Sequence, residues 1–281
     1  MSIAALEASV HKHLTYQALP IFSATSGVML AIAVASAARG ARFVTRAGAV
    51  GVAILGATIM VLTGSAVKWW GVILAFFLSA SVLTKLCRRS IPQEVADDRH
   101  GRSLAQVLAN GGPATCCVIG TILGVPNIWY LLFVSAIAAV NSDTWASEVG
   151  GRWGGFPRNI VTWDTMLPGQ SGGVSAVGIL AAFFGAVFIA LVAIAFGGAL
   201  SARAVLTVIV AGLAGCLVDS VLGATLQPVY KCTACGDRTE RQLHCNRSAQ
   251  LCAGLGWFNT HWVNFTCGCI GAFVGALLLI A

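Results

Sequence analysis

Charged residues are scarce in this chain of 281 residues: only 10% are Asp, Glu, Lys or Arg, whereas a soluble domain carries about 25%. Apolar residues make up 57% of the chain. So little charge excludes an ordinary water-soluble globular domain. The chain is therefore expected to be an integral membrane protein of all-α fold, a polytopic bundle of transmembrane helices.

Apolar runs of about 20 residues, long enough to cross the hydrocarbon layer, occur eight times. They are approximately 20–36, 48–66, 69–86, 104–124, 127–146, 172–198, 203–225 and 260–281. Seven or nine spans stay open, because the fourth and last runs are mixed in character. No removable signal peptide is expected, because the first 19 residues offer no small-residue cleavage site. The whole chain is interpreted as one membrane domain, with scaffold helices in 1–90 and a functional motif region in 91–265.

The 17 basic residues are unevenly divided between the predicted loops, and only Lys12, Lys68 and Arg203 fall outside the odd-numbered ones. The odd-numbered loops hold Arg39, Arg42, Arg46, Lys85, Arg88, Arg89, Arg99, Arg102, Arg152, Arg158, Lys231, Arg238, Arg241 and Arg247. The positive-inside rule then places these loops at the cytoplasmic face and both termini outside. Topology and attraction to anionic lipid explain most of the net charge of +7, so nucleic acid is not expected as a partner.

Ionisable residues are absent from the interiors of the first three predicted spans, so no chemistry is assigned to these spans. Their many Gly and Ala residues suit close helix packing in lipid. From residue 85 onward the predicted cytoplasmic loops are polar and rich in glycine. Four stretches in this region could carry chemistry.

The first stretch is GRSLAQVLANGG, residues 101–112. Arg102, Gln106 and Asn110 are spaced i, i+4 and i+8, so on a helix they would share one stripe. A guanidinium and two amides on one face can bind a phosphate or a polar headgroup. The alternative is an interfacial helix start that faces water.

The second stretch, NSDTWASEVG at 141–150, follows a long apolar run. If the helix continues, Asp143, Ala146, Ser147 and Gly150 fall on one face, where small residues give a bulky anion room beside an acid. Glu148 lies about 140° around the helix from Asp143, so it would pair elsewhere, for example with Arg152 at i+4. Acids within or near the hydrocarbon layer are costly and are functional candidates by default.

The third stretch is LPGQSGGVSAVG, residues 167–178. Gly169, Gly172 and Gly173 allow a tight bend, and Ser171 and Ser175 can cap the following helix. Glycines at a helix N-terminus form a ready anion site. No lysine follows, so the stretch is not a Walker phosphate loop. The alternative is an ordinary turn into a glycine-rich membrane helix.

The fourth stretch, residues 212–227, places Asp219 in an apolar run beside Val218. A lone acid in such a run needs a counter-ion or a metal. Asp143 and Asp219, facing one pocket, would hold Mg²⁺ on the phosphates of a substrate. All four stretches fall at the expected cytoplasmic face, whereas a transporter would distribute polar groups through the midplane with access to both sides.

Five motifs occur in the order and spacing of the membrane proteins related to transmembrane protein 19. They are GRSLAQVLANGG, NSDTWASEVG, PGQSGGVSAVG, VDSVLGATLQ and WFNTHWVNF. The chain resembles this family over about residues 100–265, and plant members of the family are phytyl phosphate kinases. DTWASEVGGRWGG with its Pro-Gly-Ser loop is also similar to the CTP-using membrane enzymes, which include dolichol kinase and phosphatidate cytidylyltransferase. The resemblance implies an isoprenyl monophosphate as lipid substrate and a nucleoside triphosphate, with CTP expected, as donor.

The resemblance also implies roles for single residues. Asp143 and Asp219 would hold Mg²⁺, the 168–175 loop would cradle the nucleotide phosphates, and Arg102 and Arg152 would neutralise charge. The catalytic candidates are Asp143, Asp219, Arg102 and Glu148, and the cofactor-binding candidates are Asn110, Asn141, Ser147, Arg152, Gly169, Ser171, Gly172, Gly173, Ser175, Gln227 and Asn264. An acidic or amide pair is expected near 259–261, where this chain has Asn-Thr-His, so the role of His261 stays open.

The implied reaction needs no strong general base, because an acceptor phosphate is already ionised and nucleophilic, and positioning with charge neutralisation is enough in principle. The absence of histidine from the core motifs agrees with this. Two alternatives stay open: a transporter or flippase for an anionic lipid, and a CTP-dependent cytidylyltransferase.

Ten cysteines in a protein facing the cytoplasm are expected to be reduced thiols or metal ligands rather than disulfides. Cys232, Cys235, His244 and Cys245 have acceptable spacing for a structural Zn²⁺. The pattern is not a standard double Cys-x-x-Cys, because six residues separate Cys245 from Cys252. The alternative is a set of reduced thiols in a loop.

Overall fold

The computed structural model describes residues 24–64, 66–87, 101–197 and 200–280. Eight α-helices occur in these ranges: α2 (Ala24–Gly40), α3 (Arg46–Leu62), α4 (Val67–Cys87), α5 (Leu104–Gly120), α6 (Pro126–Trp153), α7 (Ala176–Ala195), α8 (Ala202–Thr225) and α9 (Thr260–Ile280). Each coincides with one predicted apolar run. The predicted bundle is confirmed, and the chain is an all-α, multi-pass integral membrane protein.

Five helices in the described residues are long and apolar enough to cross a membrane: α4, α5 together with the 3₁₀ turn η2 (Thr121–Leu123), α7, α8 and α9. The apolar helices α2 and α3 are shorter, at 17 residues each. The longest helix is α6, with 28 residues, and its second half carries the polar stretch 141–152. Polar side chains therefore enter the bundle chiefly along α6.

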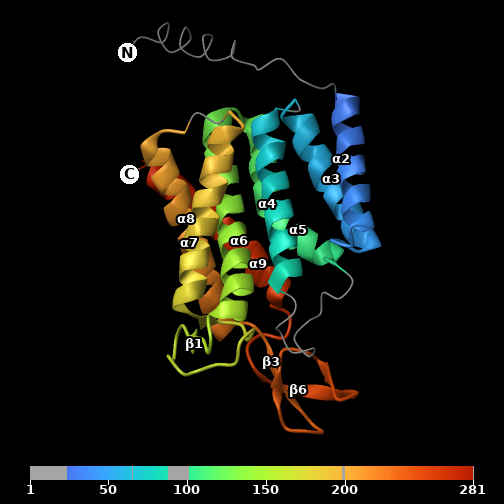
Figure 1. The fold of residues 1–281 in the computed structure, drawn as a ribbon, viewed down its shortest axis with the longest axis vertical. Coiled ribbons are helices and arrows are strands. Elements are labelled where there is room, and N and C mark those ends of the chain that lie inside the picture. The colour runs from blue at the N-terminus through green and yellow to red at the C-terminus, as the bar shows by residue number, and fades with distance from the viewer. Residues whose placement is uncertain (1–23, 65, 88–100, 198–199, 281) are drawn as a thin grey trace, which may run out of the picture.

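The helices alternate in direction, so that α2, α4, α6 and α8 end, and α3, α5, α7 and α9 begin, at one end of the bundle (Figure 1). We call it the basic end, because Arg39, Arg46, Lys85, Arg102 and Arg152 lie at these helix ends. Lys12, Arg88, Arg89 and Arg99 lie outside the described residues. The assignment of the basic end to the cytoplasm stays a prediction.

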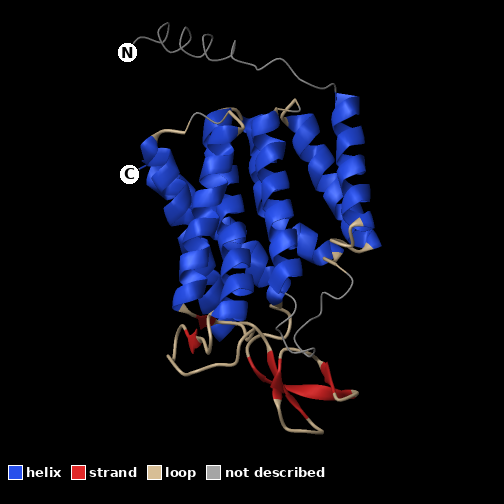
Figure 2. Cartoon of the chain, in the orientation of Figure 1, coloured by secondary structure: helices blue, strands red, loops and turns tan. Residues whose placement is uncertain are grey.

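All strands lie at the basic end (Figure 2). In the connection between α6 and α7, β1 (Arg158–Asn159) pairs antiparallel with β2 (Gly173–Val174). Between α8 and α9, the strands β3 (Val229–Cys232), β4 (Arg238–Thr239), β5 (Leu243–His244) and β6 (Arg247–Ala253) form an antiparallel sheet in the order β4-β3-β6-β5. These two elements close over the end of the bundle where the polar helix ends gather.

The centre of the bundle is α6, which packs against α4, α5, α7, α8 and α9. Its residues from Phe133 to Ser142 are buried, and several of them are Ala or Ser. Gly215 of α8 and Gly271 of α9 both pack directly against the methyl group of Ala139. Small residues let membrane helices approach this closely. Because lipid tails are as apolar as the side chains, the hydrophobic effect does not drive the helices together, and van der Waals packing stabilises their association instead.

The pair α2 and α3 stands apart from α6 and packs on α5. Ala38, Val44, Leu55 and Val107 form the small core that joins them. The backbone N–H of Arg102 donates to the carbonyl of Phe43 at 2.9 Å. The pair is thus attached to the bundle through α5 and leaves a hollow beside α4.

Replacing Gly215 with Ala is expected to destabilise the protein. The added Cβ would collide with the Ala139 methyl group and lie 2.9 Å from the carbonyl oxygen of Cys267. Overpacking costs about 1–3 kcal/mol, which exceeds the gain of about 1 kcal/mol in helix propensity. Gly151→Ala in α6 is the matched control, because nothing lies within 4 Å of its Cβ position. Thermal unfolding in detergent measures both variants, and equal unfolding temperatures would contradict the close packing.

Candidate functional site

A cavity of about 340 Å³ opens at the basic end between α6, α7, α8 and α9. Asp143, Ala146, Ser147 and Gly150 form its α6 wall, at the spacing that places residues on one helical face. We call it the acid cavity. The four residues of the second predicted stretch that were expected to share one helical face thus lie along one wall, and the third and fourth stretches supply other walls.

Asp143 on α6 and Asp219 on α8 both line the acid cavity, where their side chains lie close enough to interact. Both helices run toward the basic end (Figure 1). Ala139 and Gly215 touch about one helical turn before the acids on the two helices. The close packing at Gly215 therefore brings the two carboxylates together.

The arrangement of the acids fits the Mg²⁺ that the resemblance implies. The Oδ2 atom of Asp219 is buried and has no hydrogen-bond partner in the described part of the chain. None of the described residues that line the acid cavity is Lys or Arg, and two neighbouring carboxylates repel one another when both are ionised. Carboxylate oxygens are preferred Mg²⁺ ligands, so Asp143 and Asp219 could hold the ion.

The glycine loop, residues 168–175, forms another wall of the acid cavity, with Gly169, Ser171, Gly172, Gly173 and Ser175 all lining it. Gly172 has φ +82°, a conformation that glycine adopts without a steric penalty. A Cβ at this position would also lie 2.6 Å from the Cα of Ala224, so the loop packs closely on the end of α8. Ser175 caps α7 by accepting a hydrogen bond from the backbone N–H of Gly178 at 3.1 Å.

Glu240 is a site residue that the sequence patterns did not reveal. It lies between β4 and β5, and its carboxylate accepts hydrogen bonds from the backbone N–H of Ser171 at 2.9 Å and from Nε2 of Gln227 at 2.7 Å. Gln227 also donates to the hydroxyl of Ser171 at 2.8 Å. The sheet is thereby tied to the glycine loop. The only signal in the sequence was an acid within the cysteine loop.

The start of α9 completes the acid cavity with Thr260, Val263 and Asn264. His261 does not line it. The Nδ1 atom of His261 is buried and has no hydrogen-bond partner among the described residues. A role for this ring is therefore not assigned.

Asn141, a predicted cofactor-binding residue, lies away from the acid cavity. It is fully buried, its Nδ2 donates to the carbonyl of Gly185 at 2.8 Å, and its Oδ1 accepts from the hydroxyl of Ser79 at 3.2 Å. These bonds join α4, α6 and α7. The structure gives this amide a packing role between helices.

Glu148 and Arg152 also lie outside the acid cavity, because they project from other faces of α6. Glu148 accepts a hydrogen bond of 2.6 Å from the hydroxyl of Thr84 on α4. Arg152 is exposed, and its guanidinium lies 5.7 Å from the centre of the Trp153 ring. Neither residue is positioned against Asp143 and Asp219.

The predicted helical stripe of Arg102, Gln106 and Asn110 is wrong. The helix begins only at Leu104, because Ser103 and Gln106 form a capping box in which the backbone N–H of Ser103 donates to Oε1 of Gln106 at 2.7 Å. Arg102 precedes the helix in a β-bridge with Val44. Gln106 thus fits the alternative of a helix start, whereas Arg102 and Asn110 line a second hollow.

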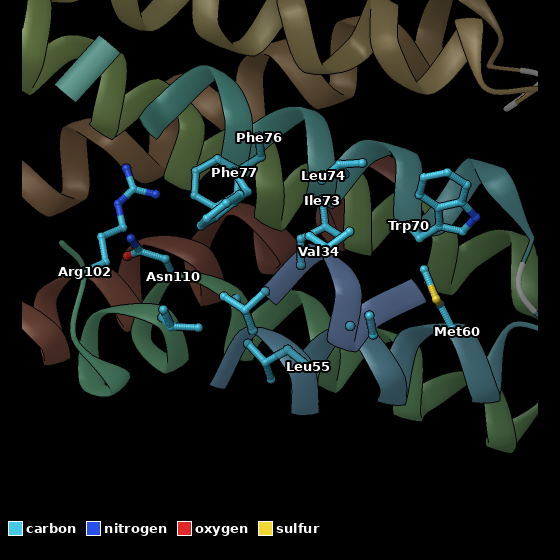
Figure 3. A pocket seen from close by; sticks show the side chains of 15 residues that line it. Val34, Leu55, Met60, Trp70, Ile73, Leu74, Phe76, Phe77, Arg102 and Asn110 are labelled. Carbon is cyan, nitrogen blue, oxygen red and sulfur yellow. The ribbon is translucent and has the colours of Figure 1, made fainter. Parts of the chain in front are cut away.

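This second hollow, which we call the apolar groove, lies between α2, α3, α4 and α5 and encloses about 90 Å³ (Figure 3). Arg102 and Asn110 lie at one end and Met60 and Trp70 at the other, with apolar side chains between them. Since Arg102 belongs to the basic end, the groove starts there and extends along the helices toward the opposite end.

The acid cavity and the apolar groove meet at one hydrogen bond. Nδ2 of Asn264, which lines the acid cavity, donates to Oδ1 of Asn110, which lines the groove, at 3.1 Å. Ligands in the two hollows would therefore approach one another at this amide pair.

The four residues proposed from their spacing as zinc ligands form one cluster at the sheet. The ligand atoms of Cys232, Cys235, His244 and Cys245 all lie within 4.8 Å of one another. The backbone N–H of Cys235 and the His244 side chain lower the pKa of the Cys232 thiol to about 6, because hydrogen bonds stabilise its thiolate. Cys252 is not part of the cluster.

Comparison with known proteins identifies the family. The family described as integral membrane protein DUF92 matches residues 29–272. The chain is 30% identical to Protein PGR of Arabidopsis thaliana over 57% of this chain and 65% of that protein. It is 32% identical to an uncharacterized membrane protein of Methanocaldococcus jannaschii over 64% of this chain and 73% of the relative.

A second plant protein is more distant. The chain is 28% identical to Protein VTE6, chloroplastic, of Arabidopsis thaliana over 54% of this chain and 48% of that protein. The aligned regions thus span less than two thirds of the two plant relatives. No solved structure matches the chain. These relatives confirm the resemblance found in the sequence motifs.

Replacing Asp219 with Asn is expected to remove the stabilisation of the protein by Mg²⁺. In the unsubstituted protein, Mg²⁺ at one hundred times its Kd should add about 2.7 kcal/mol. Without Mg²⁺, Asp219→Asn should unfold at a higher temperature, because it removes the repulsion between neighbouring carboxylates. Asp164→Asn is the control, an exposed acid outside the acid cavity. The unfolding temperature of each variant is measured with and without Mg²⁺. If Mg²⁺ raises it equally in both variants, Asp219 does not bind the ion.

Proposed function

The chain belongs to the DUF92 family of integral membrane proteins, and we propose that it is a prenyl monophosphate kinase. It would transfer a phosphoryl group from a nucleoside triphosphate, with CTP the expected donor, to phytyl or geranylgeranyl phosphate. The observation that carries the proposal is the Asn110–Asn264 contact, which joins a polar cavity with two acids to an apolar groove. The proposed acceptor has two matching parts, a phosphate and a hydrocarbon tail.

The acceptor tail would lie in the apolar groove. Val34, Ile73 and Leu74 line it and are half-buried, so the groove is accessible from the lipid. Twelve positions separate Gly48, which lies beside Arg102, from Met60. At 1.5 Å per residue the groove extends about 18 Å, more than half of the hydrocarbon thickness of about 30 Å.

The acceptor phosphate would lie at the end of the groove, beside Arg102 and Asn110. A guanidinium and an amide offer the charge-assisted and neutral hydrogen bonds that a phosphate accepts. Asn264 on the other side of Asn110 would contact the acceptor phosphate from the acid cavity. This position brings the acceptor oxygen to the boundary between the two hollows.

The donor phosphates would lie in the acid cavity, on the glycine loop and the N-terminus of α7, where backbone N–H groups and the helix dipole favour an anion. Mg²⁺ held by Asp143 and Asp219 would supply neutralisation of the phosphate charge. An oxygen of the acceptor phosphate then forms a bond to the γ-phosphorus while the bond from that phosphorus to the β–γ bridging oxygen breaks. The products are prenyl diphosphate and nucleoside diphosphate, and no general base is needed.

The comparisons support the substrate class. The similarity to the plant proteins PGR and VTE6 agrees with the resemblance to a family whose plant members are phytyl phosphate kinases. The gathering of basic residues at the end that holds the acid cavity favours a cytoplasmic active site. A nucleoside triphosphate would be available to the cavity on that side.

Two other functions predict different outcomes for the same site. A transporter or flippase for an anionic lipid would move its substrate across the membrane and leave the nucleotide unchanged. A cytidylyltransferase would attach the cytidylyl group to the lipid phosphate and release pyrophosphate. Product analysis therefore distinguishes all three.

Purified protein with geranylgeranyl phosphate, Mg²⁺ and CTP is expected to form geranylgeranyl diphosphate and CDP. Asp143→Asn and Asp219→Asn should each lower kcat by about 100-fold or more, as loss of a group that stabilises transition-state charge does. Asp164→Asn should keep the activity. Chromatography of lipid and nucleotide products gives the answer, with ATP, GTP and UTP compared as donors. Pyrophosphate release, or no diphosphate with any donor, would contradict the kinase proposal.

Filling the apolar groove is expected to reduce the use of the lipid acceptor without affecting binding of the nucleotide donor. Val52→Trp places a large ring in the groove and should lower kcat/KM for geranylgeranyl phosphate by about 10-fold, roughly 1.4 kcal/mol, while the KM for CTP is kept. Ile54→Trp on the same helix is the matched control, because Ile54 is exposed outside the groove. Steady-state kinetics measure both. Equal losses in the two variants would show that the tail does not use this groove.

A further inference from the structure

The cysteine cluster joins two turns of the sheet at the basic end. Cys232 ends β3 and Cys235 follows in the turn toward β4, whereas His244 ends β5 and Cys245 follows it. Cys235 and Cys245 are exposed, so an ion from solution could reach the cluster. The four side chains converge from segments that the sheet, rather than the sequence, brings together.

The three distances among Cys235, His244 and Cys245 are close to those of a tetrahedral zinc site. Sγ of Cys245 lies 3.8 Å from Sγ of Cys235, and Nδ1 of His244 lies 3.5 Å from Cys235 Sγ and 3.4 Å from Cys245 Sγ. Zn–S bonds of about 2.3 Å and Zn–N bonds of about 2.0–2.1 Å at tetrahedral angles place two sulfurs about 3.8 Å apart and a sulfur and a nitrogen about 3.6 Å apart. The fourth ligand atom, Sγ of Cys232, lies within 4.8 Å of the other three, so small side-chain movements would complete the tetrahedron.

The backbone around Cys232 supports a thiolate ligand. The N–H of Ala234 donates to Sγ of Cys232 at 3.4 Å, which stabilises negative charge on the sulfur. The N–H of Gly236 donates to the carbonyl of Cys232 at 3.0 Å. Gly236 has φ +81°, so glycine suits the position where this tight turn ends.

The second turn holds Cys245 in a costly conformation. Cys245 and Asn246 have φ of +52° and +55°, as the two central residues of a type I′ hairpin do, between the paired His244 and Arg247. Cysteine rarely adopts positive φ, and such residues persist where the surrounding structure determines them. Here the turn directs Cys245 toward Cys235 and His244.

We propose that Cys232, Cys235, His244 and Cys245 bind a structural zinc ion, which holds the β4–β5 segment so that Glu240 contacts the glycine loop. The three cysteines bind as thiolates, with any remaining thiol proton released to solvent, and a neutral imidazole completes the tetrahedral coordination. The ion closes the chain between Cys232 and Cys245 into a loop, and Glu240 lies within it. Glu240 is a positioning residue that acts through the N–H of Ser171 and the amide of Gln227.

The metal itself is tested on the full chain, purified in detergent without chelator. Elemental analysis is expected to find one zinc ion per chain. Cys235→Ser and Cys245→Ser should lose it, whereas Cys252→Ser, an exposed cysteine of the same sheet outside the cluster, should keep it. Zinc retained after both cluster substitutions, or a disulfide between Cys235 and Cys245 in the protein as purified, would overturn the proposal.

A spectroscopic measurement needs no substitution, and it covers the case in which the variants fail to fold. Chelator-treated protein reconstituted with Co²⁺ should show the absorption of tetrahedral cobalt with thiolate ligands, and Zn²⁺ should displace it. Absence of these bands would overturn the site. Neither measurement depends on catalysis, so the zinc proposal and the kinase proposal can fail separately.

Hydrogen exchange tests the link to Glu240. Removal of zinc is expected to speed exchange of the peptide that contains Ser171 at least several-fold, because its N–H would lose the Glu240 carboxylate. Glu240→Ala should cause the same increase while it retains zinc. Exchange at Ser171 that is unchanged by zinc removal would show that the ion does not position Glu240.

Discussion

The contact between Ala139 and Gly215 is the constraint on which the site depends. Two membrane helices that run in the same direction can place acids side by side only if their backbones approach closely, and a side chain at position 215 would separate them. Asp143 and Asp219 follow this contact by one turn on their helices. The same small surface of α6 also receives α9 through Gly271, so three walls of the acid cavity share one packing core.

Helices α2 and α3 have no ionisable residue in their interiors and carry no motif. In the proposed function they nevertheless form part of the groove that would bind the lipid tail. Because α2 packs on α3 and α3 packs on α5, an apolar groove remains beside α4, and its polar end coincides with Arg102 and Asn110. The groove and the acid cavity differ in polarity, and the Asn110–Asn264 pair separates them. A substrate with a charged head and a hydrocarbon tail suits such a boundary.

Much of the architecture could be predicted from the sequence, because hydropathy over 20 residues is a strong signal and each helix is local. The shared face of Asp143, Ala146, Ser147 and Gly150 followed from the helical period alone. The stripe through Arg102 failed, because a capping box at Ser103 starts the helix later than periodicity suggests. Glu240 and the apolar groove depend on contacts between distant segments, on which single-sequence patterns carry no information.

The position of the groove would also determine the route by which the proposed lipid substrate reaches the site. Moving hydrocarbon into water costs about 0.8 kcal/mol per CH₂ group, so a tail of some twenty carbons could not leave the bilayer spontaneously on a useful timescale. A groove lined by half-buried residues such as Val34 and Leu74 would let the tail of the proposed substrate enter sideways from the lipid. Only the headgroup would then cross into the aqueous cavity, and the finished molecule would be delivered by two-dimensional diffusion into the leaflet that supplied it.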